Sequence, residues 1–170
     1  MTFFQTIVLG QSNGTSFSLY YCFAGLGSEL GTMQPTIRIN KTNLIYTFEQ
    51  NSYFGQKSKM VDTISKVVIR QSSIDSILFL LKGIEDTSIY VTNLCMKSGG
   101  IHYMTIVNNV DTTNFSLHNT FHRTALKISN IINQYLPKNK AICATEQDII
   151  DAENCLAALR KRWVKEKKKE

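Results

Sequence analysis

Apolar side chains occupy every second position between residues 17 and 24, and this alternation constrains the fold more than any other feature of the sequence. The alternating residues are Phe17, Leu19, Tyr21 and Phe23. Successive side chains of a β-strand point to opposite faces of a sheet, so these four side chains share one face. The pattern predicts a half-buried strand that carries Tyr20 and Cys22 on its other face.

Segments rich in turn-forming residues separate this strand from others. Residues 11–14 end in Asn-Gly, a pair that tolerates the positive φ of a hairpin turn. Residues 41–43 and 108–113 also consist largely of turn-forming residues and predict two more hairpins. The strands predicted in this way span residues 3–9, 15–24, 36–40, 44–50, 61–70, 88–93, 101–107 and 114–119.

Three later segments have apolar residues at the three- and four-residue spacing of a helix. They span residues 73–82, 123–136 and 145 to the C-terminus. Ser72 or Ser73 is expected to cap the first helix, because a serine oxygen can accept from the free N–H groups of the first turn. Thr145 is expected to cap the third, with Asp148 placed to complete a capping box.

The order of these elements predicts an α+β fold. We expect a mainly antiparallel sheet built from hairpins, with two or three helices packed on one face. The last helix is amphipathic and ends in a basic segment. Residues 1–159 are therefore predicted to form one domain, followed by a basic helix end or tail at residues 160–170.

The net charge of +6 is concentrated in that tail. Residues 160–170 hold seven Lys or Arg and two Glu, whereas the other 159 residues hold 12 basic and 11 acidic side chains. The basic charge therefore describes a terminus, which is usually a solvated helix end, and not a globular surface. The alternative is contact with phosphate groups or with a membrane. The residues that would make it are Arg160, Lys161, Arg162, Lys165 and Lys167.

The four cysteines, at positions 22, 95, 143 and 155, include no CxxC pair. This spacing gives no support to a zinc ribbon or a thioredoxin-type site. The first residues lack the basic start and small-residue cleavage site of a secretory signal, and no apolar run is long enough to span a membrane. We therefore expect a cytoplasmic protein whose cysteines are reduced thiols, mostly buried.

Three histidines lie near one another in the predicted third hairpin and the helix that follows it. If the hairpin strands pair, His102 lies opposite His118 or next to it, and His122 follows near the helix start. No HExxH or CxxC motif accompanies them, so surface or hydrogen-bonded histidines are the simpler interpretation. A metal site formed by the three is the alternative.

Cys95 offers a second catalytic alternative. It precedes Gly99 and Gly100, whose N–H groups would face an oxyanion, and His102 would act as its base. Nothing in the sequence fixes these groups in register. The segment GLGSELG, residues 25–31, lacks the spacing and the following helix of a phosphate-binding loop. The sequence thus indicates no cofactor, and it favours binding over a Cys/His-dependent or metal-dependent enzyme.

Aromatic residues placed beside Asn, Ser and Thr in strands and loops are the best candidates for a binding surface. Large rings lose little conformational entropy on contact, and protein-binding surfaces are enriched in them. Burial of most of these rings in the core is the alternative. The candidate contact residues are Tyr46, Tyr53, Phe54, Tyr90 and Tyr103.

These features favour a small cytoplasmic protein that binds another protein. The richness in Ile, Asn and Lys is typical of an AT-rich bacterial genome. In that setting the concrete form of the hypothesis is an immunity protein, which binds and blocks a partner toxin. The second hypothesis is a nucleic-acid-associated protein that uses the basic tail.

Overall fold

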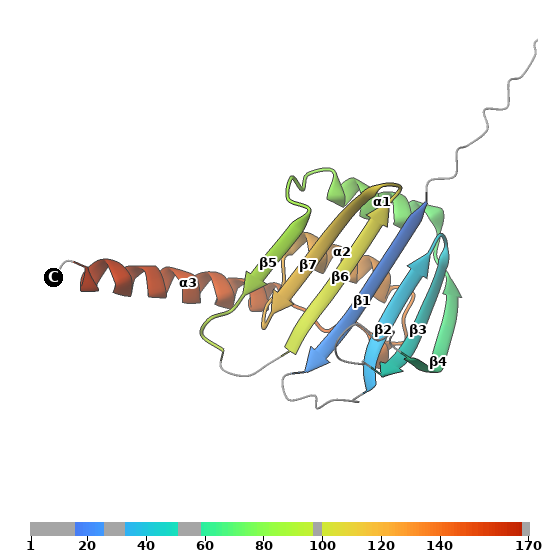
Figure 1. Ribbon diagram of the computed structural model, residues 1–170, viewed down its shortest axis with the longest axis horizontal. Helices are drawn as coiled ribbons and strands as arrows, with labels where there is room; N and C mark the ends of the chain where they lie inside the picture. Colours follow the sequence, from blue (N-terminus) through green and yellow to red (C-terminus); the bar gives the residue numbers. More distant parts are fainter. Residues whose placement is uncertain (1–15, 26–32, 51–58, 97–99, 168–170) are drawn as a thin grey trace, which may run out of the picture.

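The computed structural model describes residues 16–25, 33–50, 59–96 and 100–167, which form a seven-stranded sheet with helices on one face (Figure 1). The predicted α+β class is confirmed. The strands are β1 Phe17–Gly25, β2 Met33–Asn40, β3 Asn43–Gln50, β4 Lys59–Val68, β5 Ser88–Thr92, β6 Gly100–Asn108 and β7 Asp111–His118. The helices are α1 Gln71–Leu81, α2 Arg123–Asn133 and α3 Glu146–Glu166, with a 3-10 turn, η1, at Lys138–Lys140.

β1 lies at the centre of the sheet, in the order β4-β3-β2-β1-β6-β7-β5. All neighbouring strands are antiparallel except β5 and β7, which are parallel. The hairpins β2–β3 and β6–β7 are confirmed, and their turns place Lys41 and Asn109 at positive φ. The second turn is tighter than predicted, because the paired strands extend to Asn108 and Asp111. The predicted strand at residues 3–9 lies outside the described residues.

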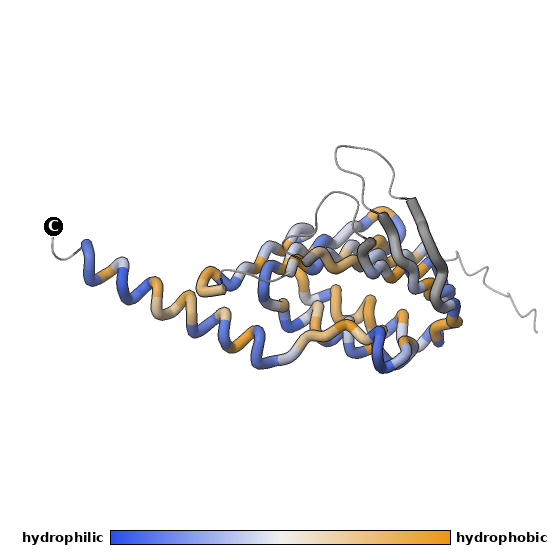
Figure 2. Tube along the Cα trace, turned by 90° about the horizontal axis from the view of Figure 1, so that it is seen from below, coloured by the Kyte–Doolittle hydropathy of each residue, from blue (hydrophilic) through white to orange (hydrophobic). Residues whose placement is uncertain are grey.

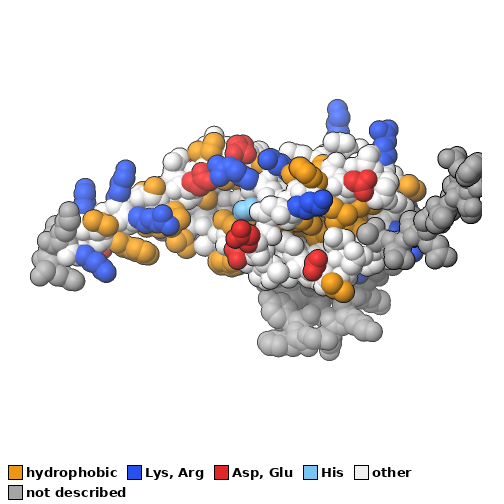
Figure 3. All heavy atoms as spheres, turned by 90° about the horizontal axis from the view of Figure 1, so that it is seen from above, with side chains coloured by type: hydrophobic (Ala, Val, Ile, Leu, Met, Phe, Trp, Pro, Cys, Tyr) orange, Lys and Arg blue, Asp and Glu red, His pale blue; other side chains and the backbone are white. Residues whose placement is uncertain are grey.

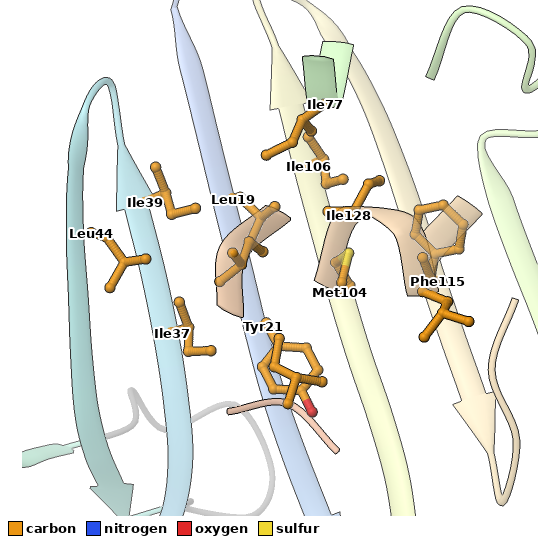
Figure 4. Packing of buried hydrophobic residues seen from close by; sticks show 14 of the residues in the cluster. Leu19, Tyr21, Ile37, Ile39, Leu44, Ile77, Met104, Ile106, Phe115 and Ile128 are labelled. Carbon is orange, nitrogen blue, oxygen red and sulfur yellow. The ribbon is translucent and has the colours of Figure 1, made fainter. Parts of the chain in front are cut away.

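The inner face of the sheet packs against α1 and α2, so that the molecule has two layers (Figure 2). Leu19 of β1, Ile37 of β2 and Met104 of β6 point inward and are at most 2% exposed. They share one buried cluster with Ile77 of α1 and Ile128 of α2 (Figure 4). Each aliphatic side chain buried in this way contributes about 1.5–3 kcal/mol, so the alternation in β1 is a main source of stability.

α1 begins two residues before its predicted start, and the predicted serine cap was wrong. Its N-cap is Arg70, whose side chain makes no capping hydrogen bond. The Arg70 N–H instead donates to the hydroxyl of Tyr135, at 3.2 Å, and that hydroxyl lies 2.7 Å from Ser73 Oγ. A partner 65 residues away thus satisfies this helix start, and no local pattern could predict it.

The start of α3 follows the prediction. The N–H of Asp148 donates to the side chain of Thr145, and the Asp148 carboxylate accepts from the Thr145 N–H, so both halves of the capping box form. The helix then runs to Glu166 and extends past the edge of the sheet (Figures 1 and 2). Within the described part of the chain, no helix has both the length and the apolar character needed to cross a membrane.

Cys95 and Cys155 form a disulfide, so the expectation of reduced thiols was wrong for these two residues. Cys95 lies in the turn after β5, and Cys155 lies in α3. Their Cα atoms are 5.8 Å apart, a normal separation for a disulfide. Only the packing of α3 beside the end of β5 brings the two together across 60 residues of sequence. Cys22 is buried and Cys143 is exposed, and neither is in a disulfide.

Replacement of Cys95 and Cys155 by serine should lower the free energy of unfolding by about 2–4 kcal/mol, because the disulfide restricts a long loop of the unfolded chain. Urea unfolding measures the loss. Thiol titration of the unfolded, non-reduced protein should find two of the four cysteines reactive. Four reactive thiols in protein purified without reductant would contradict the disulfide.

Candidate protein-binding face

The face of the sheet opposite the helices carries polar and aromatic side chains in rows across the strands. In one row Tyr103 of β6 is paired with Cys22 of β1 on one side and with Ser116 of β7 on the other. Ser116 is in turn paired with Tyr90 of β5. Tyr90 and Tyr103 are 64% and 39% exposed, so two large rings lie open on the same face.

A second row runs beside the first. Arg38 of β2 is paired with Tyr20 of β1, Tyr20 with Thr105 of β6, and Thr105 with Asn114 of β7. The guanidinium carbon of Arg38 lies 5.1 Å from the centre of the Tyr20 ring, within the range of a cation–π contact. The Thr105 hydroxyl donates to Asn114 Oδ1 at 2.9 Å. These contacts restrict the orientations of the side chains in this row.

His118 lies beside the first row and contacts both Tyr90 and Ser116. Its ring centre lies 4.8 Å from that of Tyr90, and its Nε2 lies 3.2 Å from Ser116 Oγ. Apart from Cys22, which is buried, the rows and His118 together form a surface that we call the outer patch. It consists of Tyr20, Arg38, Tyr90, Tyr103, Thr105, Asn114, Ser116 and His118.

The five aromatic residues predicted from the sequence as contact residues have three different outcomes in the structure. Tyr90 and Tyr103 belong to the outer patch. Tyr46 is 5% exposed and lies in the core, so its assignment to a binding surface was wrong. Tyr53 and Phe54 lie outside the described residues.

Sequence reasoning missed Arg38 and His118 as members of the patch. Arg38 stands between Ile37 and Ile39, which both point inward, so the alternation already placed Arg38 on the outer face. The alternation of Phe115 and Leu117 likewise placed His118 on the outer face, but its contact with Tyr90 depends on β5 lying parallel to β7.

The three histidines are not brought together. The register pairs His102 with Leu117 and Ile101 with His118. A register shifted by one residue would be needed to place the two imidazoles opposite each other. A shift of one residue places side chains on opposite faces, so His102 points to the helices and His118 away from them. His122 is the N-cap of α2 and accepts from the Thr124 N–H.

Catalysis by a Cys95 thiolate does not fit this structure. The sulfur of Cys95 is bonded to that of Cys155, and a disulfide sulfur is not a thiolate nucleophile. Within the described ranges, no group of three or more His, Cys, Asp or Glu is placed to hold a metal ion.

On the inner face, the side chain of His102 is hydrogen-bonded to that of Tyr21. Its Nδ1 lies 2.8 Å from the Tyr21 hydroxyl, and its ring contacts Phe23 and Phe121 at 4.6 Å between ring centres. Burial lowers the pKa of His102 to about 4, against a smaller opposing effect of the Asp148 carboxylate. Burial also raises the pKa of Tyr21. At neutral pH the pair is therefore an uncharged imidazole and an uncharged phenol.

The basic residues predicted to contact phosphate lie on α3 or, for Lys167, at its C-cap, apart from the outer patch. Figure 3 shows Lys and Arg side chains along the projecting part of this helix, interspersed with apolar ones. Trp163 and Val164 are 60% and 57% exposed there. The exposed basic residues are Arg160, Lys161, Arg162, Lys165 and Lys167.

Comparison with protein family models and with curated proteins finds no match to this chain.

The buried state of His102 predicts a loss of stability in mild acid. In the unfolded chain the imidazole takes up a proton near pH 6.5, whereas in the folded protein it stays neutral to about pH 4. The free energy of unfolding therefore keeps the full contribution of neutral His102 above pH 6.5. It falls as the pH drops, by about 2–3 kcal/mol at pH 4.5.

Urea unfolding at pH 7 and pH 4.5 measures this effect. The His102→Gln variant keeps a hydrogen-bonding side chain but cannot titrate, so it should lose about 2–3 kcal/mol less between the two pH values than the wild type. An equal loss in both proteins would mean that His102 is not the group responsible.

Proposed function

We propose that this protein acts by binding another protein through the outer patch. The observation that carries the proposal is the exposure of Tyr90, Tyr103 and Arg38 on one face of the sheet. Their strands are hydrogen-bonded to a neighbouring strand on both sides, except β5, which is bonded on one side. Tyr and Arg are the residue types that most often dominate the energy of protein interfaces. A sheet holds these side chains rigidly, so little conformational entropy is lost on binding.

The chemistry of the patch defines the partner surface that would fit. Arg38 fits a carboxylate or carbonyl of the partner, because the guanidinium donates hydrogen bonds and does not accept them. The hydroxyls and amides of Thr105, Asn114 and Ser116 both donate and accept, so they fit a polar protein surface. The rings of Tyr90 and Tyr103 fit against apolar side chains of the partner and give the contact its buried centre.

The concrete form that we propose is a neutraliser, such as a bacterial immunity protein that blocks a partner toxin. The expectation of a cytoplasmic location rested on the lack of a recognisable secretory signal, and it implied reduced cysteines. The disulfide between Cys95 and Cys155 does not fit that implication. Disulfides persist mainly in oxidising compartments, so we propose that the neutraliser works in such a compartment.

A second candidate function is nucleic-acid binding through the projecting part of α3. The observation that favours it is that five exposed basic residues lie on one helical segment beyond the edge of the sheet. A helix displaying this charge presents regularly spaced donors to phosphate groups. The near-neutral remainder of the chain adds little to such binding, so this candidate ranks second.

The protein-binding proposal predicts a partner whose capture depends on the outer patch. Immobilised wild-type protein should retain one partner from native lysate in stoichiometric amount. The Tyr90→Ala/Tyr103→Ala variant should weaken that complex by at least about 30-fold, because truncation of a dominant interface residue costs about 2 kcal/mol or more.

Trp163→Ala is the matched control, since it removes an exposed ring that lies outside the patch. Both variants should remain folded and unfold cooperatively on heating. Absence of a stoichiometric partner, or a partner that both variants retain equally, would refute the proposal.

The nucleic-acid candidate predicts a steep dependence on salt. If all five basic residues contact phosphates, the logarithm of the binding constant for a 20-base-pair duplex should fall against the logarithm of salt concentration with a slope of about −4.5. Replacing the five by glutamine should abolish binding. Binding that survives this change, or that is insensitive to salt, would eliminate the candidate.

A further inference from the structure

A cavity of about 410 Å³ lies between the inner face of the sheet and the chain that connects α2 with α3. β1, β2, β3 and β6 form its floor, and η1 with residues 141–143 forms much of its roof. Because α2 ends at Asn133 and α3 begins at Glu146, irregular chain covers this end of the sheet in place of a helix. The volume is within the range of small-molecule sites.

The cavity wall is mainly apolar and rich in aromatic rings. Phe23, Tyr46 and Phe121 contribute rings to it, and Ile37 and Ile142 contribute aliphatic surface. Aromatic rings attract other rings in offset or edge-on arrangements, beyond the effect of burying apolar area. The wall is therefore suited to a ligand that is itself aromatic.

Tyr21 and His102 supply polar groups to this wall. Figure 4 shows Tyr21 at one end of the buried cluster, with its hydroxyl directed away from Ile106. Whichever of the two donates in the hydrogen bond between them, one donor and at least one acceptor remain for a ligand. Both side chains are uncharged at neutral pH, so they complement a neutral polar group. Two charged residues, Lys140 and Asp148, also line the cavity, and the Asp148 carboxylate already accepts from the Thr145 N–H in the capping box.

The connecting chain that roofs the cavity is fixed in place. The side-chain amide of Asn133 donates to the carbonyl of Ile142 and accepts from its N–H, at 3.0 and 2.8 Å. The hydroxyl of Thr120 donates to the carbonyl of Asp148 at 3.0 Å, which ties the start of α3 to the wall. A cavity with a fixed roof is preorganised for a ligand.

We propose that this cavity is a binding site for a small uncharged aromatic molecule that carries one hydroxyl or amide group. The ring system lies among the aromatic side chains, and the polar group hydrogen-bonds to the pair of Tyr21 and His102. The site lies on the helix side of the sheet, so it is separate from the outer patch and does not depend on the proposed protein-binding function.

Two probes test the proposal: 2-naphthol, which is uncharged at pH 7, and 2-methylnaphthalene, which has the same shape without the hydroxyl. We expect saturable one-to-one binding of 2-naphthol, followed by its fluorescence. In the Tyr21→Phe/His102→Phe variant the preference for 2-naphthol over 2-methylnaphthalene should fall roughly fivefold, because a net hydrogen bond contributes about 1 kcal/mol.

Location is tested with a pair of tryptophan substitutions. Ala141→Trp fills the cavity and should abolish binding of both probes, whereas Ala157→Trp lies on the exposed part of α3 and should leave it unchanged. In wild-type protein, 2-naphthol should shift the ¹³C-methyl signal of Met96, which also lines the cavity. This measurement decides the location if Ala141→Trp does not fold.

The absence of saturable binding of 2-naphthol would overturn the proposal. A Met96 signal that does not move at saturation, or binding that persists in a folded Ala141→Trp variant, would also overturn it. The Tyr90→Ala/Tyr103→Ala variant should bind 2-naphthol as the wild type does. Failure of the cavity proposal and failure of the protein-binding proposal are therefore distinguished by separate measurements.

Discussion

The hydrogen bonding of β1 to a strand on each side determines which face every neighbouring side chain occupies. Because β1 pairs with both β2 and β6, its alternation is transmitted across the sheet, row by row. The position of Leu19 toward the helices requires Ile39 and Ile106 to point the same way, and the position of Tyr20 fixes Arg38 and Thr105 on the opposite side. A slip of one residue in either pairing would move apolar side chains into solvent.

The sequence was sufficient to predict those features that depend on local patterns. Alternation in the strands and turn residues at 41–43 and 108–113 predicted the hairpins, and Thr145 with Asp148 predicted the start of α3. The features that failed depend on contacts between distant residues. The partner of Ser73 is Tyr135, and the partner of Cys95 is Cys155, and neither pairing has a local signal.

The candidate sites show the same division. Tyr90 and Tyr103 were recognised as aromatic residues beside polar ones, but Tyr46 has a similar neighbourhood and is buried. Residue type cannot distinguish the two faces of a strand unless its register is known. The histidines illustrate the same limit, since a single-residue offset in β6–β7 separates His102 from His118 and creates the pair with Tyr21 instead.

The connection between α2 and α3 explains how the inner face can hold a cavity without loss of order. Irregular chain lacks the internal hydrogen bonds of a helix, so its backbone groups need other partners. Asn133 supplies two of them by bonding both backbone groups of Ile142, in the manner of a neighbouring strand. On the far side of the cavity, Met96 follows Cys95 directly, so the disulfide to α3 restrains that wall as well. These ties fix the position of the connecting chain above the sheet. The cavity thus lies beside a well-packed core, with the Tyr21 and His102 pair in its wall.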